Sequence, residues 1–123
     1  MSGNKIFVDT NILIYFLKGD QEVIEMISDK DLVISFISEL ELLSLPDLTP
    51  DSQKIVKGLL KSCSIIDINN SIKELSVNVR RQYKLKLPDS IIAATAHSIR
   101  LPLLTADKQF KTVDSIEVVL YQL

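Results

Sequence analysis

The chain of 123 residues contains little of what marks several protein classes. It has a single cysteine, Cys63, so no intramolecular disulfide can form and the reducing cytoplasm is the expected compartment. Its longest apolar run, residues 12–17, falls far short of the roughly 20 residues that a membrane-spanning helix needs. No basic segment with an apolar core and a small-residue cleavage site stands at the N-terminus, so we expect no signal peptide and no membrane partner.

Glycine and proline are also few, with three and four residues, and they are scattered. Because no repeat, linker or biased segment interrupts the chain, we expect a single domain over residues 1–123. Lys plus Arg number 14 and Asp plus Glu 16, which gives a formal charge of −2. This charge argues against a protein that coats nucleic acid through bulk positive charge, but it does not exclude a local basic patch.

Short apolar runs alternate with helical patterns along the chain. The expected strands cover residues 5–8, 32–34, 64–67, 103–105 and 116–120, and the expected helices cover 11–17, 21–28, 36–45, 50–62, 71–83 and 88–96. Segment 36–45 is apolar nearly all round, which predicts a buried helix. Thr49 before Pro50, and Ser71 with Glu74, are expected helix starts. The alternation predicts an α/β fold with a doubly wound, mainly parallel sheet of about five strands and helices on both faces.

Four acidic residues stand where such sheets place their sites, near the carboxyl ends of strands. Asp9 ends the first expected strand, Asp107 follows the fourth, Asp89 opens a helix, and Glu41 lies in the helix after the second strand. Like charges this close are unfavourable unless something neutralises them, and a divalent cation is the usual choice. An all-oxygen ligand set favours Mg²⁺ or Mn²⁺, and a chain with one histidine and one cysteine disfavours zinc.

Each acid also has a simpler interpretation. Asp9, Asp89 and Asp107 are all suited to a helix start, either as N-caps or through the helix dipole. Glu41 stands three residues after Ser38, which is the spacing of a capping box. Glu39 also competes with Glu41 for a place at the site, because the two lie about 200° apart on a helix and the apolar pattern does not choose between them.

The chain resembles the PIN domain family, specifically the small VapC-type ribonuclease toxins of prokaryotic toxin–antitoxin pairs. Four ordered segments carry the resemblance: Val8-Asp9-Thr10-Asn11, residues 34–38 with Glu41-Leu42, residues 87–96, and Leu104-Thr105 with Asp107 and Phe110. The third segment, which contains Pro88-Asp89-Ser90, is the most specific. The segments extend from residue 8 to residue 110, so the resemblance covers nearly the whole chain.

The resemblance implies a metal-dependent endoribonuclease that hydrolyses RNA phosphodiester bonds with Mg²⁺ or Mn²⁺ and an activated water. It makes a set of four acids the metal-binding and catalytic residues: Asp9, Glu41, Asp89 and Asp107. The family's offset from Ser35 favours Glu41 over Glu39. Thr10, Asn11 and Thr105 become polar supports of the same pocket. Many relatives carry a further acid directly after the last one, whereas Lys108 and Gln109 stand here, so the presence of a second metal stays open.

The resemblance also implies partners: an RNA substrate, a second copy in a homodimer, and a small antitoxin protein. Apolar residues near the N-terminus are candidates for protein contacts or for the core: Ile12, Ile14, Tyr15 and Phe16. Basic residues close to two of the acids are candidate RNA contacts, or else a solvated surface: Arg80, Arg81, Lys84, Lys86 and Lys108. Tyr83 beside them is a candidate for stacking a base, or for the core. We expect a structural or surface role for His97.

Two other functions are compatible with the pattern. The first is a PIN-like domain that binds RNA or protein without cutting RNA. The presence of all four acids argues against this function. A phospho-accepting receiver domain has a similar sheet and would use Asp67 and Thr105. Against the receiver, Asp9 has no adjacent acid and no lysine follows the last expected strand.

Overall fold

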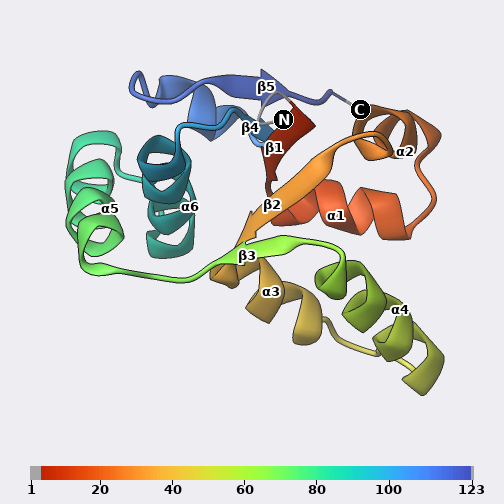
Figure 1. Cartoon of the computed structure of the whole chain (residues 1–123). Helices are drawn as coiled ribbons and strands as arrows, with labels where there is room; N and C mark the ends of the chain where they lie inside the picture. The colour runs from red at the N-terminus through yellow and green to blue at the C-terminus, as the bar shows by residue number, and fades with distance from the viewer. Residues whose placement is uncertain (1–3, 123) are drawn as a thin grey trace.

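A single sheet of five parallel strands forms the centre of the computed structural model, which describes residues 4–122 (Figure 1). The strands are β1 (Lys5–Val8), β2 (Asp31–Ser35), β3 (Ser64–Ile66), β4 (Leu103–Thr105) and β5 (Val118–Leu120). They lie in the order β3-β2-β1-β4-β5, and every neighbouring pair is parallel. The chain therefore winds outward from the central β1 first to one side and then to the other, which confirms the predicted fold class.

Six α-helices and a short 3₁₀ helix connect these strands. They are α1 (Thr10–Leu17), α2 (Gln21–Ile27), α3 (Phe36–Leu43), α4 (Pro50–Lys61), α5 (Asn70–Tyr83), α6 (Leu87–Ile99) and η2 (Lys108–Thr112). The start of α4 is as predicted, because the Thr49 side chain accepts a hydrogen bond from the Ser52 N–H and Pro50 opens the helix.

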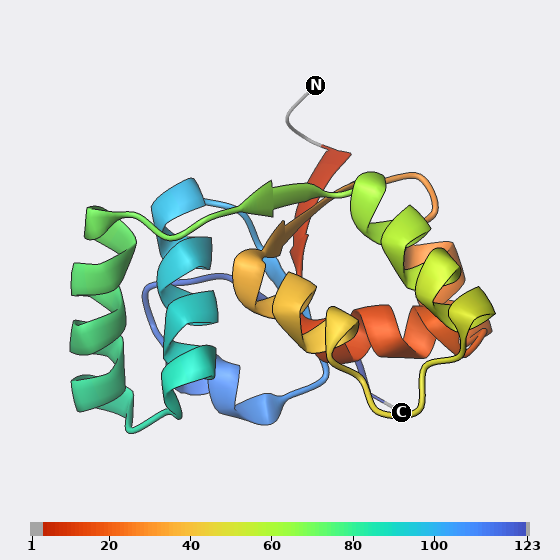
Figure 2. The same cartoon turned by 90° about the horizontal axis from the view of Figure 1, so that it is seen from below.

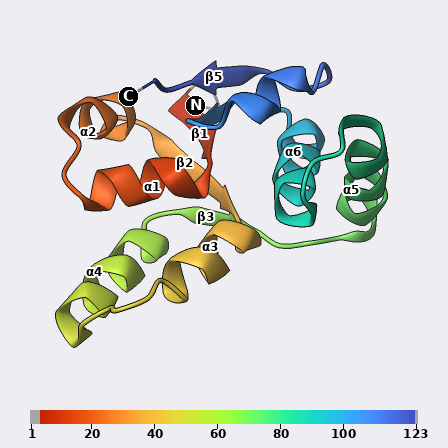
Figure 3. The same ribbon diagram turned by 180° about the vertical axis from the view of Figure 1, so that it is seen from behind.

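The helices cover both faces of the sheet, with α5 and α6 side by side on one face and α1, α2 and α4 on the other (Figures 2 and 3). Successive strand residues point to opposite faces. Val8 accordingly packs with residues of α1, α2 and α4, whereas Phe7 packs with residues of α5 and α6. Both side chains are fully buried, so β1 is covered on both sides, as its continuous apolar run predicts.

Helix α3 differs from its prediction, since it is shorter than segment 36–45 and is not buried. Only Ser38 and Leu42 are buried in it, while Leu40 and Leu43 are 55% and 44% exposed. Apolar residues occupy the outer side of this helix as well as the inner side, and its hydrophobicity therefore overstated its burial. The two exposed leucines leave an apolar strip on the surface.

Other element boundaries also differ from their predictions, and α6 extends three residues past its predicted end, to Ile99. The start of α5 is capped by Asn69, whose side chain accepts from the Ile72 N–H at 2.9 Å, so the predicted capping box at Ser71 is wrong. Ser71 instead lies inside the first turn. Strand β5 begins two residues later than expected, at Val118, and the helix η2 before it was not predicted. Its five residues are too few for a periodic pattern to show.

The end of β5 is fastened to the turn between α1 and α2. The buried Tyr121 hydroxyl lies 3.0 Å from both carboxylate oxygens of Asp20, to which it donates. Asp20 also caps α2 by accepting from the Val23 N–H at 3.1 Å. Burial and the neighbouring Asp20 raise the pKa of Tyr121 to about 12. The hydroxyl therefore keeps its proton, and the hydrogen bond, throughout the physiological pH range.

We find no helix within residues 4–122 that is both long and apolar enough to cross a membrane.

Candidate metal and nuclease site

Asp9 is the most enclosed of the four predicted acids, because it ends the central strand β1 and caps α1. Its side chain is only 5% exposed. One carboxylate oxygen accepts from the Thr10 N–H at 2.8 Å, and the other accepts from Thr105 Oγ1 at 2.7 Å and from Asn11 Nδ2 at 3.2 Å. Three donors thus hold this carboxylate at the carboxyl edge of the sheet, and the simpler interpretation of Asp9 as an N-cap also holds.

The pKa of Asp9 is raised to about 6. Burial is the largest cause, because it disfavours the charged form. The hydrogen bonds from Thr105 and Thr10 act in the opposite direction, and the negative charges of Asp89 and Glu41 add to the rise. Asp9 is therefore a buried carboxylate with two acidic neighbours, and a positive charge beside it would relieve both unfavourable effects.

Glu41 reaches this region through Thr10, whose hydroxyl lies 2.6 Å from Glu41 Oε1 and 2.8 Å from Ser38 Oγ. Ser38 and Glu41 are three residues apart on α3 and so share one face. Ser35 caps α3 instead, accepting from the Ile37 N–H, so the capping box predicted for Ser38 and Glu41 is wrong.

Sequence reasoning missed the contribution of Ser38. It is fully buried and joins α3 to α1 through its contact with Thr10. Its spacing of three residues from Glu41 was the signal that could have found it, but the same spacing suggested a helix cap. Glu39 has no hydrogen bond among the described residues, whereas Glu41 contacts Thr10 and raises the pKa of Asp9.

The loop after β4 is folded onto the site by Thr105 and Asn11. Thr105 Oγ1 accepts from the Asp107 N–H at 3.0 Å while it donates to Asp9. Asn11 Oδ1 accepts from the Ala106 N–H at 3.2 Å. Asp107 then caps η2, as its simpler interpretation requires, by accepting from the Gln109 N–H. The three predicted supporting residues therefore all contact an acid or the loop that carries one.

Asp89 lies in the first turn of α6 and is half-buried. Burial is the main cause of its raised pKa, followed by the charges of Asp107 and Glu41, while Lys86 acts in the opposite direction. Asp89 thus connects the two parts of the site electrostatically. We use the name acid cluster for Asp9, Glu41, Asp89 and Asp107, which the fold brings to one edge of the sheet from four different elements.

The acid cluster has the oxygen donors that Mg²⁺ and Mn²⁺ prefer, and its buried member carries an electrostatic cost that a cation would remove. Among residues 4–122, no three Asp, Glu, His or Cys side chains converge into a ready-made metal cage. Mg²⁺ does not need one, because it usually keeps several waters and is bound through one or two carboxylates. The residues present therefore fit such an ion.

The five predicted basic residues divide into two groups by their position. Lys86 precedes α6 directly and lowers the pKa of Asp89, and Lys108 opens η2 beside Asp107. Lys84 lies in the connection between α5 and α6, and Arg80 and Arg81 lie in the last turn of α5. This connection and η2 lie on the same side of the molecule as the carboxyl ends of the strands (Figure 2). Tyr83 is half-buried against the core of the α5 and α6 face.

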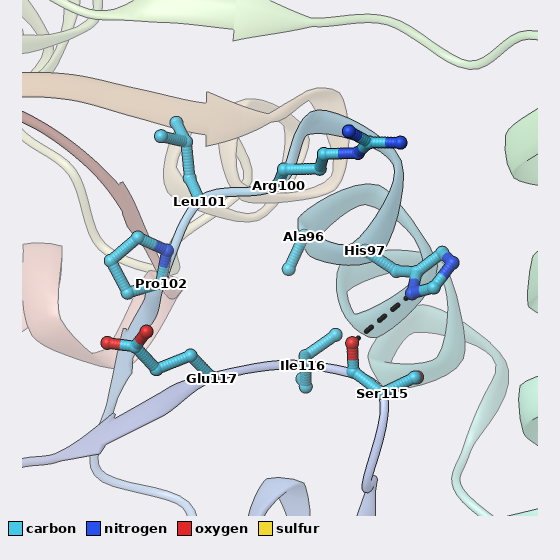
Figure 4. A pocket seen from close by; sticks show the side chains of 8 residues that line it. All are labelled: Ala96, His97, Arg100, Leu101, Pro102, Ser115, Ile116 and Glu117. Atoms are coloured by element: carbon cyan, nitrogen blue, oxygen red, sulfur yellow. Dashed lines mark hydrogen bonds between the residues drawn. The ribbon is translucent and has the colours of Figure 1, made fainter.

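A pocket of about 390 Å³ lies at the amino ends of the strands, opposite the acid cluster. It is found where α6 ends and the chain enters β4 and β5 (Figure 4). His97 is exposed at its rim, and its Nδ1 lies 3.3 Å from the carbonyl oxygen of Ser115. This surface position agrees with the role expected for His97.

The sheet order argues against the receiver interpretation. Asp67 follows β3, which is an edge strand, and Thr105 ends β4, which lies three strand spacings away. At about 4.8 Å per spacing the two residues are separated by roughly 14 Å across the sheet, too far to hold one phosphoryl group. Thr105 instead donates its hydrogen bond to Asp9.

Fold and site together define a parallel α/β domain with an acidic site at the carboxyl edge of its sheet. The family model for the PIN domain matches residues 6–116, so the chain belongs to the PIN domain family. The resemblance noted from the sequence is thereby confirmed.

Individual relatives agree with this assignment over nearly the whole chain. The chain is 28% identical to Ribonuclease VapC2 of Methanocaldococcus jannaschii, covering 97% of this chain and 95% of the relative. A toxin–antitoxin complex from Klebsiella pneumoniae contains a chain that is 34% identical, with a TM-score of 0.85 over 96% of this chain and 99% of that one. VapBC2 from Rickettsia felis, bound to a DNA fragment from its promoter, shares the fold with a TM-score of 0.84 at 20% identity over the same shares.

Proposed function

We propose that this protein is a VapC-like toxin, an endoribonuclease that hydrolyses RNA phosphodiester bonds with a divalent cation. The observation that carries the proposal is the buried Asp9 carboxylate, held by three hydrogen-bond donors next to two further acids. A protein rarely keeps such a costly group unless it has a use for it. The relationship to Ribonuclease VapC2 supports RNA as the substrate class.

In this proposal Asp9, Glu41, Asp89 and Asp107 hold Mg²⁺ or Mn²⁺, and these acids are the catalytic residues. When bound, such an ion lowers the pKa of a coordinated water so that the water can attack phosphorus at neutral pH. Thr105 and Asn11 keep Asp9 in one orientation, and Thr10 does the same for Glu41. Glu41, Asp89 and Asp107 are more exposed than Asp9, and in this proposal they face the incoming RNA.

We propose that the basic residues near the acid cluster hold the RNA backbone, with Lys86 and Lys108 as the nearest contacts. None of the five basic residues forms an ion pair within the described part of the chain, so their charges are free for phosphate. Replacing Lys86 by glutamine should weaken RNA binding and reduce the slope of log binding constant against log salt by about 0.7, the value for one phosphate of a single strand. Fluorescence anisotropy of labelled RNA at several salt concentrations measures this slope. An unchanged slope would remove Lys86 from the RNA path.

We also propose an antitoxin protein and a second copy of this chain as partners. The chain related to this one in the Klebsiella pneumoniae structure was solved as a toxin–antitoxin complex, which supports the first. The apolar strip of Leu40 and Leu43 on α3 supports contact with another protein. Light scattering of the purified chain measures its oligomeric state, and a monomer at micromolar concentration would contradict the homodimer.

Cleavage of a labelled single-stranded RNA pool by the purified protein tests the proposed function. We expect cleavage with Mn²⁺ or Mg²⁺ and none after chelation, with activity restored by excess metal. Cleavage that continues in the chelator would contradict the proposed chemistry. Tight RNA binding without cleavage under any of these conditions would favour the non-catalytic PIN-like module.

A further inference from the structure

A second pocket lies beside the loop that carries Asp107, between α1 and the end of β5. Its volume is about 250 Å³, and its lining residues are Tyr15, Ala106, Lys108, Leu120, Tyr121 and Gln122. Two of the six, Ala106 and Lys108, flank Asp107 in the sequence. The pocket therefore shares its wall with the loop that carries the last acid of the cluster.

The distance from this pocket to Asp9 follows from the geometry of α1. Asn11 contacts both Asp9 and the Ala106 N–H, and Tyr15 lies one helical turn further along the same face. One turn of an α-helix rises by 5.4 Å. The pocket thus lies about one turn beyond the acid cluster, a separation that a single nucleotide of an extended RNA strand can bridge.

The chemistry of the lining suits a nucleobase. The half-buried Tyr15 offers an aromatic ring for stacking, and Leu120 and Ala106 add apolar surface. The exposed Gln122 carries a carboxamide, which can both donate to and accept from the edge of a base. Lys108 stands on the side of the acid cluster, where it meets a phosphate if a base occupies the pocket.

The Tyr15 ring packs against a second ring of the pocket lining, that of Tyr121. The Tyr15 and Tyr121 rings are 6.1 Å apart at an angle of 53°. The Tyr121 hydroxyl donates a hydrogen bond to the Asp20 carboxylate, which fixes the Tyr121 ring. Tyr121 therefore acts as a support for Tyr15, and the stacking ring is positioned before any ligand arrives.

We infer that this pocket is a base-binding subsite, in which Tyr15 and Gln122 receive the nucleobase next to the scissile phosphate and set the preference for the cleavage site. The inference rests on the proposed ribonuclease function and extends it. It identifies a surface that distinguishes one base of the substrate from another. The acid cluster alone would cleave RNA of any sequence.

Cleavage-site mapping on a random single-stranded RNA pool tests the subsite. Wild type should prefer certain bases at one position adjacent to the cut. Tyr15→Leu should lower kcat/KM for the preferred sites on the order of tenfold to a hundredfold, the effect of losing one base–aromatic stack. Tyr15→Phe keeps the ring and should retain the preference. Gln122→Leu should flatten the base frequencies at that one position, and Gln53→Leu on the distant α4 is the matched control.

The possible failures are distinguishable. A wild type that does not cleave contradicts the proposed function itself. If wild type cleaves, and both Tyr15→Leu and Gln122→Leu show the base preference and rate of Gln53→Leu, then the subsite is wrong and the pocket serves another purpose. If Tyr15→Leu does not fold, Gln122→Leu decides the question, because Gln122 is exposed and its replacement leaves the core untouched.

A binding experiment checks the same inference without cleavage. Ultraviolet cross-linking of a preferred RNA to the Asp89→Asn variant should join the RNA to the peptide that contains Tyr15. Cross-links confined to peptides elsewhere in the chain would overturn the subsite, whatever the cleavage data show.

Discussion

Replacing Asp89 by asparagine should lower the rate of RNA cleavage by at least about a hundredfold and leave the protein folded. Loss of one preorganised group that stabilises the transition state costs about this much in other enzymes. Asp89 is close enough to Glu41 and Asp107 for their charges to raise its pKa, so it belongs electrostatically to the acid cluster. Its carboxylate accepts no side-chain hydrogen bond within residues 4–122, and its replacement breaks no contact that holds the fold together.

The matched control for this experiment is Asp67→Asn. Asp67 is exposed at the end of the edge strand β3, three strand spacings from Thr105. The Asp67→Asn variant should cleave RNA at the wild-type rate. Circular dichroism and thermal melting check that both variants fold. Equal turnover by Asp89→Asn and wild type would remove Asp89 from the site. Loss of cleavage in Asp67→Asn alone would place the catalytic site away from the acid cluster.

Replacing Asp9 by asparagine should stabilise the metal-free protein at neutral pH while it destroys activity. The pKa of Asp9 is about 6 in the folded protein, whereas an unperturbed aspartate side chain, as in the unfolded protein, has a pKa of 3.8. Below about pH 4 the carboxyl is protonated in both the folded and the unfolded state. As the pH rises from about 4 to 6, the unfolded state loses this proton first, and the folded wild type becomes less stable. The rise in the Asp9 pKa from 3.8 to about 6 lowers the free energy of unfolding of the wild type by about 3 kcal/mol above pH 6.

The asparagine variant lacks this titration, so its stability should not fall between pH 4 and pH 6 on account of residue 9. The variant will gain less stability than this value of about 3 kcal/mol. The reason is that the amide of the Asp9→Asn variant would be a poorer acceptor than the carboxylate for the hydrogen bonds that Thr105 and Asn11 donate. We expect the variant to be more stable than wild type by about 1–2 kcal/mol at pH 7 in the presence of chelator. Denaturant melts at pH 4 and pH 7 measure this, and the exposed Asp114→Asn is the matched control.

Metal should reverse the order of stability of the two proteins. Binding to the folded state alone adds about 2.7 kcal/mol when the free ion is at a hundred times its dissociation constant. Mn²⁺ should therefore raise the melting temperature of wild type and have little effect on Asp9→Asn. An equal rise in both proteins would mean that the ion binds somewhere other than the acid cluster.

Most of the fold could be predicted because local patterns and tertiary structure agree in this chain. Phe7 and Val8 of β1 are buried on opposite faces of the sheet, as their apolar run predicts, and Thr49 with Pro50 starts α4 by local chemistry alone. The burial of α3 could not be predicted in this way. Its outer residues Leu40 and Leu43 are largely exposed, and hydrophobicity does not tell a core contact from an exposed surface.

The candidate site was predictable in its residue types but not in its connections. Acids at strand ends and a family resemblance pointed to Asp9, Glu41, Asp89 and Asp107. The link through Thr10 to Ser38 depends on how α1 and α3 pack, and no spacing along the sequence reports that. The pKa of Asp9 depends on burial and on neighbours up to 96 positions away in the chain, so it also required the structure.

The chemistry of the RNA ends tests the central claim most directly. Hydrolysis by water with departure of the 3′ oxygen leaves a 5′-phosphate and a 3′-hydroxyl, whereas attack by the neighbouring 2′-hydroxyl leaves a cyclic phosphate and a 5′-hydroxyl. The measurement is sequencing of new ends in total cellular RNA treated with protein and Mn²⁺, with libraries that require a 5′-phosphate, against Asp89→Asn prepared identically. We predict discrete 5′-phosphate ends with wild type only. Ends common to both proteins, or new ends that carry a 5′-hydroxyl, would contradict a metal-dependent ribonuclease centred on the acid cluster.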